Sequence, residues 1–450
     1  MTDGPRVTVV GAGLAGLLMG VSLGRRGFRV SLFDKRLEAE LLYESTAGRP
    51  DAATVTGRTV RSLEEVDLAD SLRTVAIPLR GRSIRSEEER SVFQVFQTGD
   101  EGVYAIELRA LRERLLNAAR SMPHVHVSFN RKCILIDKAS GTSCFEDQGT
   151  GHVLRIASDF IVGADGKASK CRQDSFRGEI AHFAQTRWDG GYRVRHLSAA
   201  EARVLHLSDD AINISGAKTA PELLWTLPHG DGSHTAFLIH RHVSPSGREP
   251  LTDGFAALSL IRPLTITARP WHFGRVVLIG EACHAEPPFF TSCVDEAFDD
   301  CRVLSHCIDR ARGAFESAFA EYESIRYREV EALRKLSTLH CEDLWRHFQS
   351  PAFFHRRRIE WSCRRLFPTL LPIHELPAQV RMTHLEALSQ YQRQQAIMRR
   401  TGLSFALTVA GHAAARWSLP LKGRGGAIGA AKRPLAAADF VNARAGGQNG

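Results

Sequence analysis

The sequence predicts an α/β protein in which a Rossmann-like nucleotide-binding domain is interleaved with an antiparallel-sheet domain and followed by a C-terminal helical region. Three observations support this fold class. A strand, a glycine-rich turn and a helix open the chain, and short strand-like runs fill residues 175–270. Helical periodicity then dominates from Phe298 to about Arg400.

The composition indicates a globular chain that acts on small molecules. With 450 residues, 43% of them hydrophobic, the chain can bury one or two large cores. The net charge of +9 comes from scattered basic residues, which favours anionic small ligands and excludes a nucleic-acid stripe. Nine cysteines without a Cys-x-x-Cys pair indicate reduced thiols and no metal site, so we expect a cytoplasmic protein.

No segment predicts a membrane span. Met1–Pro5 runs directly into a strand and not into a signal peptide. Leu403–Gly411 is the most apolar late stretch, and it is far shorter than the ~20 residues that cross a bilayer. A helix lying on a membrane surface is the alternative there, but we expect no contact with a membrane surface.

The first elements form a strand, a helix and a second strand. They are predicted in this order: Arg6–Val10 as a central parallel strand, Gly11-Ala-Gly-Leu-Ala-Gly16 as the turn, Leu17–Arg26 as a helix capped near Gly27, and Arg29–Phe33 as a strand ending at Asp34.

The glycine turn is typical of adenine-dinucleotide binding. Gly11 makes the tight turn, Gly13 lets the backbone approach a pyrophosphate, and Gly16 allows the helix to pack closely on the strand. The helix N-terminus offers N–H groups to the phosphates, and Asp34 can accept the ribose hydroxyls. An ordinary strand-helix turn is the alternative.

Two later segments have the same strand-to-loop pattern. Ser158–Gly166 is an apolar strand leading into Gly-Ala-Asp-Gly, for which a simple Asp-Gly turn is the alternative. Residues 275–301 are predicted as a buried strand, a turn, a loop and then a helix. Leu108–Arg120 is an amphipathic helix, and Val125–Phe129 begins a strand.

These elements predict the domain organisation. The nucleotide-binding domain takes 1–174, with substrate-side insertions near 70–105, and returns at 271–325. The antiparallel domain takes 175–270, the helical region 326–420 and a loose tail 421–450. The antiparallel domain holds strands such as Glu222–Leu227 and His234–His240.

In series, the three segments resemble the flavin-binding motifs of the aromatic-ring hydroxylases, whose FAD-binding domain is of the p-hydroxybenzoate hydroxylase type. Within that group the chain resembles the kynurenine 3-monooxygenase family. The likeness runs through Val9–Asp34, Gly48–Leu68, Ile77–Ser86, Leu115–Val127, Phe160–Asp165 and His284–Cys301. The resemblance implies non-covalent FAD, reduction by NADPH or NADH, and hydroxylation of an aromatic amine ring.

The resemblance also implies which residues hold the cofactor. They are Gly11, Gly13, Leu14, Ala15, Gly16, Asp34, Lys35, Arg36, Arg49, Arg109, Asp165, Gly280, Glu281 and Pro288. Two of these depart from the pattern. Glu281 stands where the family has Asp, and Arg109 lies one residue after the expected position, which falls on Leu108.

The flavin-ring end departs further. Thr291, Ser292 and Cys293 replace a glycine turn that permits close approach of the backbone. Asp295 and Glu296 add two carboxylates at the start of the helix. Capping that helix is their simple role. If they face the flavin, they oppose its reduced, anionic form.

The substrate residues of the family also differ. Its carboxylate-binding Arg, its Tyr, its Asn and its second Tyr fall on Arg82, Phe96, His340 and His384, and Phe289 adds an aromatic ring. With His284, the two substituted histidines are candidate acid–base groups, while packing or surface positions are the alternative. The expected substrate is a small anionic or zwitterionic molecule other than kynurenine, and the expected assembly is a monomer or homodimer.

Three functions therefore fit the sequence. The first is an FAD-dependent monooxygenase with a new aromatic amino-acid-like or amine substrate, acting in a specialised biosynthetic route. The second is a non-oxygenating enzyme that catalyses a cyclisation, rearrangement or elimination, with FAD structural or lost. The third is a non-catalytic ligand-binding protein. The intact glycine turn favours the first two, and the altered ring end favours the last two.

Overall fold

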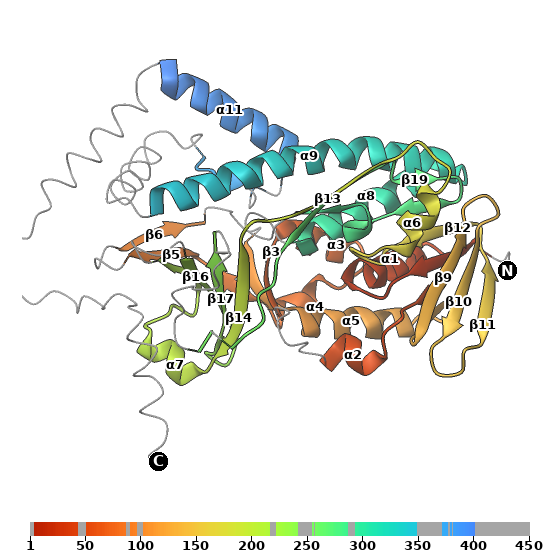
Figure 1. Cartoon of the computed structure of the whole chain (residues 1–450), viewed down its shortest axis with the longest axis horizontal. Coiled ribbons are helices and arrows are strands. Elements are labelled where there is room, and N and C mark those ends of the chain that lie inside the picture. Colours follow the sequence, from red (N-terminus) through yellow and green to blue (C-terminus); the bar gives the residue numbers. More distant parts are fainter. Residues whose placement is uncertain are drawn as a thin grey trace, which may run out of the picture.

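The computed structural model describes residues 4–43, 51–86, 91–96, 102–216, 222–241, 254–255, 257–286, 293–348, 371–376, 379 and 381–400. Two sheets lie side by side in it, and one long helix runs along both (Figure 1). Within these residues, no helix is long and apolar enough to cross a membrane. Arg49, Pro288 and Phe289, all predicted site residues, lie outside the described part.

The first sheet is mainly parallel and has the strand order β19-β20-β12-β1-β2-β8. Its strands are β1 (Arg6–Val10), β2 (Arg29–Phe33), β8 (Val125–Ser128), β12 (Phe160–Gly163), β19 (His272–Phe273) and β20 (Val276–Leu278). Only the β19–β20 pair is antiparallel among these described strands. The central strands read Val-Thr-Val-Val and Phe-Ile-Val because both of their faces are buried.

Helices cover the first sheet. They are α1 (Leu14–Arg25), α2 (Glu38–Tyr43), α3 (Gly57–Glu64), α4 (Ala69–Arg73), α5 (Leu108–Arg120), α6 (Lys170–Phe176) and α8 (Cys293–Ala311). The amphipathic segment Leu108–Arg120 is a helix at the predicted bounds, and it buries Leu111, Leu115 and Leu116 against α1. Helix α8 begins at Cys293 and holds Asp295 and Glu296 in its first turn, where they were predicted.

The second sheet has the order β14-β17-β16-β15-β5-β6. Its strands are β5 (Gly81–Ser86), β6 (Ser91–Val95), β14 (Gly191–Leu197), β15 (Ala211–Gly216), β16 (Glu222–Pro228) and β17 (His234–His240), with α7 (Ala199–Val204) after β14. Strands β5 and β6 therefore enter a sheet whose other four described strands come from later in the chain. The prediction of an interleaved α/β fold with an antiparallel sheet is confirmed, except that β15 and β5 pair in parallel.

Three smaller sheets complete the described strands. They are β3 (Ala52–Thr56) with β7 (Val103–Glu107) and β4 (Ile77–Leu79), then β9 (Arg131–Asp137), β10 (Thr142–Asp147) and β11 (Val153–Ala157), and finally β13 (His182–Arg187), β18 (Leu264–Arg269) and β21 (His284–Ala285). The last set corrects the expected loop after residue 280, because a short 3₁₀ turn, η2 (Gly280–Ala282), and the strand β21 precede α8.

Helix α9 (Phe315–Phe348) joins the two halves of the molecule (Figure 1). Phe319 and Tyr322, near its start, are buried in the core of the first sheet. Leu344 and Trp345, near its end, are buried against the second sheet. Helix α11 (His384–Arg400) packs on α9. A single helix therefore fixes which side of the second sheet faces the nucleotide-binding half.

The packing of α9 on the first sheet predicts a large effect of Phe319→Ala. Phe319 is fully buried, and its ring meets that of Phe160 with centroids 5.4 Å apart. The cavity left by the substitution should cost about 3–5 kcal/mol and lower the melting temperature in thermal denaturation followed by circular dichroism. Ile325→Ala is the control, because that side chain on the same helix is 39% exposed. Equal shifts in the two variants would contradict the assignment of Phe319 to the core.

Candidate flavin and substrate site

The loop after β1 has room for a ligand above Gly13. A Cβ atom on Gly11 would lie 2.4 Å from the carbonyl oxygen of Ala164, and one on Gly16 would lie 1.8 Å from that of Gly11. Gly13 differs, because a Cβ there would meet no described atom within 4 Å. Helix α1 begins at the next residue without a side-chain cap, so its first N–H groups face this space. The loop therefore fits a pyrophosphate group.

Asp34 lies at the end of β2 and is buried. Its carboxylate accepts hydrogen bonds from the backbone N–H of Ala12 at 2.7 Å and from Nε and Nη2 of Arg36 at 2.9 and 2.7 Å. Burial opposes ionisation, but the hydrogen bonds and charge of Arg36 outweigh it and lower the pKa of Asp34. Asp34 is thus an ionised acceptor beside the loop, while Lys35 is exposed. Ribose binding by these residues stays a prediction.

The Gly-Ala-Asp-Gly segment meets the third motif. Asp165 caps α6 by accepting from the Ser169 hydroxyl at 2.6 Å and from two backbone N–H groups of that helix. The guanidinium of Arg172 donates to the carbonyl oxygens of Lys167 and Ala282, both at 2.7 Å. Sequence reasoning missed Arg172, because only the fold brings α6 against η2.

Two of the predicted third-motif residues lie where the motifs converge. The Nζ atom of Lys167 is 3.1 Å from Oε1 of Glu281, so the second and third motifs are joined by an ion pair. A Cβ on Gly280 would lie 3.6 Å from the Cβ atoms of both Ala15 and Ala297, which places Gly280 between the N-terminal parts of α1 and α8. The nucleotide loop and the third motif therefore form one continuous site.

Arg109 is the cofactor candidate with the weakest structural support. It lies in the first turn of α5, where its Nε donates to Oε1 of Glu113 at 3.0 Å. Its side chain is 46% exposed. Leu108, at the position that matches the family, packs against the first core. A role for Arg109 at a phosphate stays a prediction.

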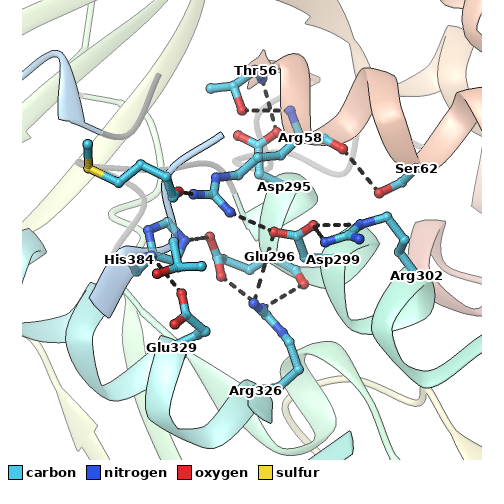
Figure 2. Close-up of polar contacts among 12 residues, drawn as sticks. Thr56, Arg58, Ser62, Asp295, Glu296, Asp299, Arg302, Arg326, Glu329 and His384 are labelled. Carbon is cyan, nitrogen blue, oxygen red and sulfur yellow. Dashed lines mark hydrogen bonds and ion pairs between the residues drawn. The ribbon is translucent and has the colours of Figure 1, made fainter. Parts of the chain in front are cut away.

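Helix α8 buries four carboxylates that bind side chains and backbone groups of neighbouring elements, and Figure 2 shows three of them, Asp295, Glu296 and Asp299. We call Asp295, Glu296, Asp299 and Asp300 the α8 carboxylates. Glu296 is 2.9 Å from Nη2 of Arg326 and 2.8 Å from Nε2 of His384. Burial opposes its ionisation, but the charges and hydrogen bonds of His384 and Arg326 hold the pKa of Glu296 well below its usual range.

Arg326 also binds the next part of the network. Its Nε donates to Asp300 at 2.7 Å, and the other oxygen of Asp300 accepts from Nε2 of His284 at 2.7 Å and from the N–H of Gly280 at 2.8 Å. Asp299 pairs with Arg58 at 3.0 Å. His284 and His384 thus hold carboxylates of α8, and an acid–base role for either remains a prediction.

The network provides partners for Asp295 and Glu296, the two carboxylates at the start of α8. Glu296 contacts a buried arginine and a histidine, and Asp295 accepts from the N–H of Thr56 at 3.0 Å and the hydroxyl of Thr59 at 2.7 Å. Their contacts tie α8 to β3, α3, α9 and the start of α11. The two carboxylates therefore join these elements. This role differs from both predicted roles, which were helix capping and opposition to a reduced flavin.

The substrate candidates Arg82 and His340 meet on the second sheet, although 258 positions separate them. Both are buried, and Nη1 of Arg82 is 3.0 Å from Nε2 of His340. A guanidinium can only donate, so Nε2 of His340 accepts and its ring proton is on Nδ1. Gln94, directly opposite Arg82 on β6, accepts from Nε and Nη2 of Arg82 at 3.2 and 2.8 Å.

Phe96 and His384 have different surroundings. Phe96 follows Gln94 by two residues, so it shares the face of Arg82, and it packs half-buried in the second core. His384 is bonded to Glu296, and no described contact brings it to Arg82. Gln94 was not predicted. Strand alternation places it on the same face as Phe96, but the register that sets it opposite Arg82 comes from the structure.

One further titratable group was missed. Glu286 follows β21 and is half-buried, and its burial raises the pKa to about 7, against the opposing charges of Arg334 and His284. Such a carboxyl exchanges protons near neutral pH. No local sequence pattern indicates it, because the shift depends on tertiary burial.

Filling the space at Gly13 should abolish nucleotide binding without unfolding the protein. We expect Gly13→Val to lose bound FAD, measured by absorbance and by fluorescence of released flavin, while the melting temperature of the flavin-free protein stays the same. Gly16→Ala is the contrast, because its Cβ would collide with backbone and should lower that melting temperature. Full flavin occupancy in Gly13→Val would contradict the proposed cradle.

Asp295 should make stability depend on pH. Burial raises its pKa from 3.8 to about 6. The folded state therefore binds the proton more tightly, and this contribution to stability is lost as pH rises from about 4 to 6. Asp295→Asn should remove a penalty of up to about 3 kcal/mol, so its melting temperature should exceed wild type at pH 8 but not at pH 4.

The control for this experiment is Glu316→Gln, at an exposed position in the first turn of α9. Because its carboxylate favours the helix N-terminus, this substitution should not raise the melting temperature at pH 8. A gain for Asp295→Asn that does not change with pH would show that the carboxyl does not titrate in this range.

Comparisons with known proteins agree with this geometry. Residues 5–186 match the FAD binding domain family. Kynurenine 3-monooxygenase of Salinispora arenicola is 28% identical over 435 residues, which cover 90% of this chain and 94% of that protein.

Two solved structures have the same fold. The structure of 2-methyl-3-hydroxypyridine-5-carboxylic acid oxygenase aligns with a TM-score of 0.64 and 20% identity over 78% of this chain and 96% of the other. That of p-nitrophenol 4-monooxygenase from Pseudomonas putida aligns with a TM-score of 0.65 and 18% identity over 81% and 99%. The expected flavin-binding fold is confirmed. Residues 5–186 therefore carry the FAD binding domain, and the chain is similar to kynurenine 3-monooxygenases over most of its length.

Proposed function

We propose that this protein is an FAD-dependent monooxygenase of the kynurenine 3-monooxygenase type that acts on an aromatic compound other than kynurenine. Its substrate is anionic or zwitterionic, an aromatic amino-acid-like compound or amine, and its reaction belongs to a specialised biosynthetic route. It works in the cytoplasm as a monomer or homodimer and takes electrons from NADPH or NADH. The contact between Arg82 and His340 carries this proposal.

The face of the second sheet that holds Arg82 suits an aromatic acid. Tyr192, Trp225 and Phe237 share this face by strand register, and Tyr192 and Phe237 meet edge to face with centroids 6.0 Å apart. Arg82 supplies a positive charge at one end of this aromatic surface, and a guanidinium binds a carboxylate through two parallel hydrogen bonds. A ring and an acid group on one molecule would satisfy both parts.

The opposite end of the same face points to the nucleotide-binding half. Burial raises the pKa of Tyr192 to about 12. Cys293 and Glu281 contribute less to this shift, and their contribution indicates that Tyr192 lies near the third motif. A substrate held by Arg82 with its ring over these aromatic residues extends toward that motif. This arrangement supports a reaction between bound substrate and a flavin held by the three motifs.

The chain's own residues then have defined tasks. Arg82 binds the acid group, and Gln94 and His340 fix the plane of its guanidinium. The first turn of α1 would hold the pyrophosphate of FAD. FAD, once bound, supplies electron transfer from the pyridine nucleotide and the activation of oxygen. The substitution of Tyr by Phe96 and of Asn by His340 changes the polar groups that meet the substrate, which supports a substrate other than kynurenine.

The test combines flavin reduction with ligand binding. We expect yellow protein that NADPH or NADH bleaches under nitrogen, and ligand-dependent oxygen uptake with a product that carries one added oxygen atom by mass spectrometry. Arg82→Met should weaken binding of an aromatic acid by about 10- to 100-fold through loss of a charge-assisted contact and leave flavin occupancy intact.

Arg85→Met is the matched control. Arg85 lies on the same strand, but it faces the other side of the sheet, where its guanidinium donates to the carbonyl oxygens of Leu205 and His206. It should bind the acid as wild type does. A colourless protein that FAD does not reconstitute, or a flavin inert to both nucleotides, would refute the oxygenase function.

A further inference from the structure

A cavity of about 330 Å³ lies between α6 and the paired strands β13 and β18. Its lining comes from α6 with the turn before it and from the two strands: Lys167, Ala168, Arg172, Gln173 and Phe176, then Phe183, Gln185 and Leu264. The face of the second sheet that holds Arg82 contributes none of these residues. The volume is at the lower end of the range for ligand sites, so it suits a molecule with a single ring.

One side of the cavity is apolar and partly open to solvent. Phe183 on β13 is 44% exposed, and Phe176 on α6 is half-buried. Leu264 on β18 shares the face of Phe183, because the two strands pair in antiparallel register with Phe183 opposite Ala268. A ligand ring that covers these three side chains would remove their apolar surface from water.

Arg172 brings a buried positive charge to the same cavity. It is 4% exposed, its guanidinium carbon lies 4.5 Å from the centroid of the Phe183 ring, and it donates to two backbone carbonyls. Among the described residues, no carboxylate lies within ion-pair distance of this guanidinium, and the charge of Asp165 acts on it from farther away. A buried cation in this position favours an anionic ligand.

Lys167 adds a second, more exposed cation. Its Nζ atom is 3.1 Å from Oε1 of Glu281, and the two side chains are 44% and 38% exposed. Exposed ion pairs contribute little free energy, so a ligand carboxylate can share Lys167 with Glu281 at small cost.

The first turn of α6 is already occupied, which favours a carboxylate over a phosphate. Helix N-termini bind phosphates through free backbone N–H groups. In α6 the N–H groups of Lys170 and Cys171 donate to Asp165, and that of Arg172 donates to the hydroxyl of Ser169. The two side-chain cations are left to hold the anion, and a dinucleotide would bring at least two phosphate groups to them.

We propose that this cavity, which we call the α6 cavity, is a second ligand site that takes a small aromatic carboxylate. The ring would cover the three apolar side chains, and the carboxylate would lie against Arg172 and Lys167. The same two residues contact Ala282 and Glu281 of η2, so the ligand would lie beside the third motif and apart from Arg82. This site does not depend on the proposed oxygenase function.

Calorimetry with the full-length Arg82→Met protein, with FAD added, separates the α6 cavity from the substrate face. The probe is 3-phenylpropanoate, which has one ring and one carboxylate, and the neutral control is 3-phenylpropanamide. We expect the acid to bind with a Kd between about 10 µM and 1 mM, and the amide to bind about tenfold or more weakly. No binding of the acid below about 10 mM, or equal binding of acid and amide, would overturn the proposal.

Two variants in the same background locate the bound acid. Phe183→Ala removes the exposed ring and should weaken binding about tenfold, and Lys167→Gln should weaken it about two- to fivefold. Their matched controls are His182→Ala, the exposed neighbour on the other face of β13, and Lys170→Gln, an α6 lysine that pairs with Asp174 outside the cavity. Equal affinities in test variants and controls would show that the acid binds elsewhere and that the proposal is wrong.

A pyridine nucleotide is the competing occupant, so NADPH is titrated into the same proteins. If Phe183→Ala and Lys167→Gln weaken the binding of NADPH but not that of 3-phenylpropanoate, the α6 cavity is a nucleotide site and the proposal fails. Weaker binding of the acid in both variants supports it. Because these titrations need no turnover, a flavin that is not reduced would refute the oxygenase function and leave this site standing.

Discussion

The buried guanidinium of Arg326 holds the site together. It is 2% exposed, and it binds Glu296 and Asp300, whose other oxygens hold His384, His284 and the backbone of Gly280. Removing one partner of such a network leaves an uncompensated buried charge, which costs far more than an exposed ion pair contributes. Through this one side chain, α9 fixes the third motif, the start of α8 and the start of α11.

This arrangement also concerns the conflict that the sequence suggested between the α8 carboxylates and a reduced flavin. Negative charge at the start of α8 looked harmful to a reduced flavin. In the structure Glu296, Asp299 and Asp300 contact buried arginines of neighbouring helices, which offset much of their charge within the protein. Asp295 is the exception, because Thr56 and Thr59 give it hydrogen bonds but no full counter-charge.

Local patterns predicted the elements well, and tertiary contacts account for what they missed. The strand, helix and strand of residues 6–33, the helix Leu108–Arg120 and the strand His234–His240 follow from periodicity and glycine positions. The parallel pairing of β15 with β5 does not, because register between distant strands leaves no local trace. Arg82 and His340 were linked only through family resemblance, and Gln94 needed the observed register. The partners of Glu296 and the pKa of Glu286 depend on burial, which no local pattern encodes.

Helix α9 limits the insertions and deletions that this chain can accept. Arg326 and His340 are 14 positions apart, about 21 Å along the axis and close to a whole number of turns, so both project from nearly the same side. Inserting or deleting one residue between them would rotate His340 by about 100° relative to Arg326 and separate it from Arg82. The distance and the angular phase between the half of the first sheet and the half of the second sheet are thus set by one stretch of helix. Substitutions are compatible with that phase, whereas a single insertion or deletion would break it.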